Sequence, residues 1–184
     1  MKRIISSGLL FVCLTIFASA VVLAKTYPKP LSTPTPTPVP KVSYELPYPG
    51  ILPDHPLYFL KAFRDRLLGF LIQDPVKKAE FNLLMADKRL NMGVFLADSG
   101  KPALSEITLS KGEKYFELAV SELPKASAQG KEVEAWLVDK FQKAAAKHEE
   151  VLTEFLEKMP EEQKRGIQES LNLVKTIKEE VSKL

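Results

Sequence analysis

Histidine is the side chain best suited to act as a general base or a metal ligand near neutral pH, and the chain contains two. His148 lies on the apolar stripe of a predicted helix, so we expect a buried imidazole that is hydrogen-bonded to a neighbour. Glu149 and Glu150 follow it directly, but helical geometry sends their carboxylates to other faces. His55 stands in an Asp-His-Pro sequence, where we expect it to set the turn before a helix.

The other reactive side chains do not form a recognisable site. A zinc site needs three or four converging ligands, and the single cysteine, Cys13, lies in an apolar leader. The serines lack a glycine elbow, and the glycines do not cluster into a phosphate-binding loop. Adjacent glutamates do not face each other on a helix, so we interpret three pairs as solvated faces: Glu149 with Glu150, Glu161 with Glu162, and Glu179 with Glu180. We therefore predict a noncatalytic protein with no cofactor and no metal.

Residues 1–24 have the layout of a secretory signal peptide. Lys2 and Arg3 precede an uncharged run over residues 4–24, which ends in small side chains at the spacing that a signal peptidase reads. The alternative is an uncleaved membrane anchor, because 21 residues could just cross roughly 30 Å of hydrocarbon. Both interpretations place the rest of the chain outside the cytoplasm, either secreted or at the cell surface.

Residues 25–43 are predicted to be an extended linker. Nine of the 14 prolines fall between Pro28 and Pro53, and alternating Thr-Pro pairs exclude a regular helix. Such a segment favours polyproline II, which gives a reach of roughly 40 Å over 13 residues. We interpret it as a spacer; the alternative is a docking peptide for an aromatic groove.

The charge balance gives no indication of nucleic-acid binding. Without residues 1–24 the chain keeps 24 basic and 23 acidic side chains, and residues 42–184 alone carry a net charge of about −2. Nucleic-acid binding needs a clustered basic face. We predict that the chain does not bind nucleic acid, and that it meets a membrane through residues 4–24 only if the signal is not cleaved.

A strip of large apolar side chains follows the linker, where a spacer has no use for them. Its residues are Tyr44, Leu46, Tyr48, Ile51 and Leu52. We expect this strip to pack against the folded domain as a collar. The alternative is that a partner protein binds it.

The chain after Asp54 reads as five helices separated by proline and glycine. We predict helices over about 56–73, 75–99, 102–123, 132–158 and 160–184, with Asp74 capping the second and Gly100 ending it. The third is expected to bury Leu104, Ile107, Tyr115, Leu118 and Val120. The first is apolar on most of its circumference, which indicates a central, deeply packed helix. Five amphipathic helices with short connections predict an all-α fold, an antiparallel bundle in a single domain over residues 44–184.

Four motifs occur together and in order over residues 44–90: LPYPG, LPDHPLY, DPVKKAE and ADKRL. This stretch resembles the bacterial extracytoplasmic helical domains grouped as domain of unknown function 5667. The resemblance continues more weakly to Leu123, and residues 131–184 are similar to a carboxy-terminal helical hairpin common in such proteins. It implies an all-helical domain behind a signal or anchor, and it implies no activity.

Taken together, these features predict a noncatalytic interaction or structural module of the bacterial cell envelope with a protein partner. One alternative is an extracytoplasmic domain that senses a small ligand or metal, with a pocket lined by Phe59, Phe63, Phe81, Tyr115 and Trp136. A second is a peripheral membrane binder that uses the first helix, where Lys61, Arg64 and Arg66 would meet lipid headgroups. Its difficulty is that the bundle is expected to need the same apolar surface.

Overall fold

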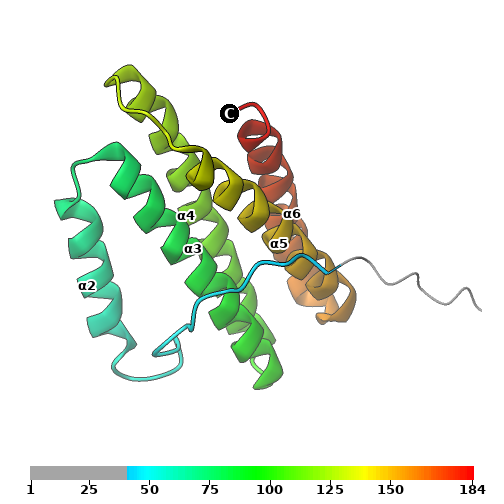
Figure 1. The fold of residues 1–184 in the computed structure, drawn as a ribbon. Helices are drawn as coiled ribbons and strands as arrows, with labels where there is room; N and C mark the ends of the chain where they lie inside the picture. Colours follow the sequence, from blue (N-terminus) through cyan, green and yellow to red (C-terminus); the bar gives the residue numbers. More distant parts are fainter. Residues whose placement is uncertain (1–40) are drawn as a thin grey trace, which may run out of the picture. The chain divides into compact units, whose positions relative to one another are not determined.

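The structure, a computed structural model, describes residues 41–184. The predicted leader (1–24) and all but the last three residues of the predicted linker (25–43) lie outside the described residues. Within residues 41–184 the chain forms five helices and no strand, which confirms the all-α prediction (Figure 1). The helices are α2 (Tyr58–Leu71), α3 (Pro75–Asp98), α4 (Pro102–Ala128), α5 (Ala135–Lys158) and α6 (Glu161–Val181).

Helix ends follow the proline and glycine pattern of the sequence, with one exception. Asp74 caps α3 by accepting a hydrogen bond from the Lys77 N–H at 3.0 Å. Gly100 ends that helix with a φ of 72°, a left-handed conformation that suits glycine. The exception is Pro124, which was predicted to end the third helix but lies inside α4. Its missing N–H removes one hydrogen bond of the helix, while Leu123 and Ala126 stay buried and hold the last turn in place.

The core of the bundle is built by α3, α4, α5 and α6. It consists of two apolar clusters, one containing Leu83, Phe116 and Phe141 and the other containing Leu109 and Leu152. The set of residues predicted to be buried in α4 is partly wrong, because Ile107 and Leu118 are about half exposed. Leu109, Phe116 and Leu123 are the side chains that α4 actually buries.

Helices α3 and α4 approach each other closely at small residues. A Cβ atom on Gly93 would overlap the Leu109 side chain, and one on Gly112 would lie 3.1 Å from Arg89 Cβ. The Ser105 hydroxyl donates a hydrogen bond of 2.7 Å to the Gly93 carbonyl across the same contact. The small residues therefore set the distance between the two helices.

The prediction that the first helix is central is wrong. Helix α2 lies at the edge of the bundle beside α3 (Figure 1), and its one buried residue is Asp65. Apolar content alone predicted burial, but the large apolar side chains of α2 point away from the core. The core of α3–α6 is complete without them.

Residues 41–53, which we call the strap, cross the bundle in an extended conformation before α2 begins (Figure 1). The Val42 N–H donates to Glu150 Oε2 of α5 at 2.6 Å, and the Asn91 side chain of α3 donates to the Pro47 carbonyl at 2.9 Å. Lys61 of α2 donates to the Pro49 carbonyl at 2.7 Å. The strap thus connects α5, α3 and α2 in that order.

Candidate functional site

His148 is fully buried and lies between two carboxylates from other helices. Its Nδ1 is 2.9 Å from both oxygens of Glu113 on α4, and its Nε2 is 3.1 Å from Asp87 Oδ1 on α3. The ring also packs against Phe116, with 4.9 Å between centroids. We call Asp87, Glu113 and His148 the charged layer; along α3, α4 and α5 it falls between the residues of the two apolar clusters.

The charged layer carries a protonated imidazole at neutral pH. Burial opposes the charge, but Glu113 and Asp87 outweigh it and raise the pKa of His148 to about 9. Among residues 41–184 no buried side-chain nitrogen or oxygen lacks a hydrogen-bond partner. Because each ring nitrogen already binds a carboxylate, the ring has no free lone pair to offer a metal or a substrate. This arrangement suits a structural role, as the sequence predicted for His148.

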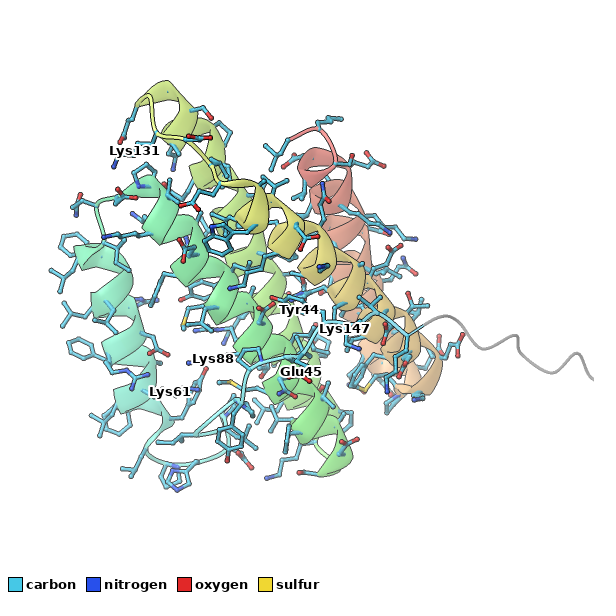
Figure 2. All side chains as sticks on the ribbon, in the orientation of Figure 1. Tyr44, Glu45, Lys61, Lys88, Lys131 and Lys147 are labelled. Atoms are coloured by element: carbon cyan, nitrogen blue, oxygen red, sulfur yellow. The ribbon has the colours of Figure 1, made fainter. Side chains whose placement is uncertain are left out.

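The strap closes the charged layer on the outside. The Tyr44 hydroxyl donates a 2.6 Å hydrogen bond to Asp87 Oδ2, and burial together with the Asp87 charge raises the pKa of Tyr44. Beside it Lys147 pairs with Glu150 at 2.7 Å, and Figure 2 shows Tyr44 and Lys147 where the strap crosses the helices. Glu150 is therefore partly buried and paired, which corrects the interpretation of Glu149 and Glu150 as a solvated face.

The five residues of the predicted strip separate into two groups. Tyr44 and Leu46 pack against the two core clusters, and Leu52 is partly buried. Tyr48 and Ile51 point outward, and Tyr48 is 78% exposed. The strip is thus divided between attachment to the bundle and an outward surface next to α2.

The predicted aromatic pocket does not form. Phe59 and Phe63 lie on the outer surface of α2, and Trp136 is half exposed at the start of α5. The Tyr115 ring lies against the Arg89 guanidinium, 4.0 Å from ring centroid to Cζ. Residues 41–184 also hold no group of three or more histidine, cysteine or acidic side chains arranged to bind a metal ion.

The most unusual surface of the described chain is the outer face of α2. It consists of six large exposed apolar side chains: Phe59, Leu60, Phe63, Leu67, Phe70 and Leu71. Leu67 is just under half exposed and the other five are more than half exposed. Phe63 and Phe70 are exposed by 69% and 74%. Contiguous apolar patches of this kind mark interaction sites on soluble domains.

The opposite face of α2 is small and polar, which explains its orientation. Tyr58, Ala62, Asp65 and Gly69 face the bundle and are buried or partly buried. The Phe81 ring of α3 packs at Gly69, where an added Cβ would lie 3.1 Å from it. Helix α2 therefore packs against the bundle through the face that carries its small residues.

A basic crevice runs along one edge of this outer face, between α2, α3 and the strap. Its lining residues are Tyr48, Pro49, Gly50, Ile51, Leu57, Leu60, Lys61, Arg64 and Lys88. Burial and the neighbouring Lys88, Arg89 and Arg64 charges, opposed by Asp65, lower the pKa of Lys61 to about 8. Positive charge is thus concentrated at the border of the apolar surface, and Figure 2 shows Lys61 and Lys88 there.

Lys61, Phe59 and Phe63 were candidate site residues in the sequence, but the structure gives them other positions than those predicted. In the alternative of a peripheral membrane binder Lys61 would meet lipid headgroups, yet its ammonium turns inward and donates to the Pro49 and Ile51 carbonyls. The outward orientation of α2 was missed. One signal could have revealed it, because the face opposite the apolar arc contains Asp65 together with the small residues Ala62 and Gly69.

None of the helices within residues 41–184 is both long and apolar enough to cross a membrane. A comparison with protein families matches residues 50–162 to the family described as a domain of unknown function, DUF5667. The chain belongs to this family, which confirms the family named above, and the match begins at Gly50 and covers α2 to α5. Comparisons with curated proteins and with solved structures give no match.

Proposed function

We propose that this member of the domain of unknown function 5667 family is a noncatalytic interaction module that works outside the cytoplasm, at the cell envelope. Its binding surface is the outer face of α2 together with Tyr48 and Ile51 of the strap. The leader predicted at residues 1–24 supports the location. The interaction role rests on the geometry of α2.

One observation carries this proposal: six large apolar side chains are exposed on one helix of a domain whose core is complete without them. Leaving such a surface in water costs free energy, at roughly 25 cal/mol for each Å² of apolar area. The same helix has a small, polar face that it could have exposed instead. The arrangement therefore favours a surface that is covered in the working protein.

Site-specific photo-crosslinking in cells that produce the full chain tests this role. We place p-benzoylphenylalanine at position 63 on the outer face of α2, and at position 118 as the matched control. Leu118 is an apolar residue of α4 that is about half exposed, and α4 does not contact α2. We expect adducts from position 63, with protein or with lipid, and few from position 118. Equal yields at the two positions, or none at position 63, would contradict the proposed function.

A further inference from the structure

We propose that the partner of α2 is the surface of an anionic lipid bilayer. In this arrangement the outer face of α2 lies among the acyl chains just below the headgroups, and basic side chains at its edges bind headgroup phosphates. The inference rests on the proposed function and names the class of partner. It also removes the difficulty met in the sequence, since the bundle does not use the apolar surface of α2.

The side-chain arrangement of α2 matches a helix that lies flat in a membrane surface. At about 100° per residue, the six apolar residues occupy an arc of about 120°. Arg66 follows one edge of this arc and Arg64 the other, and both are exposed. An apolar arc bordered by basic residues is the pattern of interfacial helices. The helix has 14 residues, about 21 Å, which suits lying in the surface and not crossing it.

The charges around α2 favour an anionic surface. The only acidic residue of α2 is Asp65, which faces the bundle and pairs with Arg64 at 2.6 Å. In the crevice Lys88 and Arg64 add positive charge next to Leu60 of the apolar arc, while the Lys61 ammonium is held by the Pro49 and Ile51 carbonyls. The headgroup phosphate of a lipid bound there would lie next to these basic side chains. The acyl chains of the same lipid would contact the leucines and phenylalanines of the outer face.

The same charges argue against a second copy of the chain as the partner. Pairing two outer faces would bring Arg64 and Arg66 of one copy near those of the other. Asp65, the one acidic residue of α2, is turned inward and already pairs with Arg64 of its own copy, so α2 offers no carboxylate to the arginines of a second copy. Like charges placed together across an interface are unfavourable.

The experiment uses the full chain and a readout local to α2, so that any membrane affinity of residues 4–24 does not decide the result. Cys13→Ser removes the single cysteine, and Phe63→Cys then carries a nitrobenzoxadiazole dye, which brightens and shifts to the blue in an apolar environment. The matched control carries the dye through Leu118→Cys. Vesicles are made of phosphatidylcholine alone, or of phosphatidylcholine and phosphatidylglycerol in equal parts.

We expect the dye at position 63 to respond to the anionic vesicles and the dye at position 118 to remain unchanged. Arg64→Gln with Arg66→Gln should raise the lipid concentration at half response by about 25-fold, since each basic residue near an anionic surface contributes about fivefold. Lys143→Gln with Arg165→Gln, exposed basic residues on α5 and α6, should leave it within about twofold. Phe59→Ser with Phe70→Ser should weaken the response about 100-fold or more.

Three results would overturn the lipid assignment. The first is no response at position 63 with anionic vesicles, and the second is an equal response with phosphatidylcholine alone. The third is a response that depends on protein concentration without vesicles, which would indicate a second copy. Photo-crosslinking at position 63 to a protein alone, combined with no dye response, would leave the interaction function standing and reject the membrane.

Discussion

At the scale of single residues, His148 balances two buried carboxylates with one charge. Removing charged groups from water is costly, and it is tolerated where the partners satisfy each other through good hydrogen bonds. Here Glu113 and Asp87 bind the two ring nitrogens, and Tyr44 binds the remaining oxygen of Asp87. The histidine therefore contributes to stability only while it is protonated.

This arrangement predicts a loss of stability at mildly alkaline pH. The pKa of His148 is raised from 6.5 to about 9 in the folded chain, so its contribution is fully present below pH 6.5 and is lost as pH rises through 9. Between pH 7 and pH 9 the loss amounts to about 2 kcal/mol of the free energy of unfolding. Urea unfolding of the full chain at several pH values measures it.

The control is His148→Gln, which cannot titrate in this range. Lys61, whose pKa is lowered to about 8, gives a contribution of opposite sign, but it is common to both proteins and cancels in their difference. We expect the variant to be less stable at pH 7 and to lack the additional loss between pH 7 and pH 9. Parallel pH profiles would mean that His148 is not charged at neutral pH.

The partners of His148 could not be read from the sequence. Glu113 and Asp87 lie 35 and 61 residues away along the chain, and no local pattern links them to a histidine on another helix. The burial of His148 was predictable because the residue continues the apolar spacing of α5. Glu113 lies between the buried Leu109 and Phe116 in the same way, which is the one sign of its position.

At the scale of elements, helix boundaries were predicted well and helix orientation less so. Asp74, Gly100 and Pro160 act locally, through caps and backbone angles, and local signals are legible in one sequence. Whether an apolar helix faces inward is decided by what the other helices already bury. The core of α3–α6 is complete without α2, so the phenylalanines of α2 face outward.

The close contact of α3 and α4 predicts that replacing glycine by alanine lowers stability at position 93 but not at position 166. Gly93→Ala should destabilise the fold by about 1–3 kcal/mol, because the new methyl group overlaps the fully buried Leu109. Gly166→Ala, inside α6, meets only the end of the Glu106 side chain, which can move. Since alanine favours helix over glycine by up to about 1 kcal/mol, this control should be neutral or stabilising. Thermal unfolding of both variants measures the difference; a Gly93→Ala variant as stable as Gly166→Ala would refute the close contact.

At the scale of the whole molecule, the strap connects parts of the bundle that are distant in sequence. Tyr44 and Leu46 pack on different core clusters, while Asp54 pairs with Lys101 at the start of α4. The outward-pointing Tyr48 and Ile51 lie between these attachments. The strip predicted from sequence thus contains the anchoring residues as well as residues available to a partner.

We expect a chain that begins at Asp54 to be less stable than one that begins at Lys41. The shorter chain loses the half-buried Tyr44 and Leu46 and the hydrogen bond to Asp87, for about 2–4 kcal/mol in all. Urea unfolding of the two chains measures the difference, and Tyr44→Phe in the longer chain isolates the hydrogen bond. Equal stability of the two chains would mean that the strap does not pack against the bundle in solution.

The attachment of the strap also has a mechanical consequence. A pulling force applied at Lys41 would load the Val42 bond to Glu150 first, then Tyr44 on Asp87, then Pro47 on Asn91, and then Pro49 on Lys61. Bonds loaded one after another yield at lower force than bonds loaded together. Tension on the amino-terminal side would therefore peel the strap from α5 and α3 one bond at a time before it reached α2.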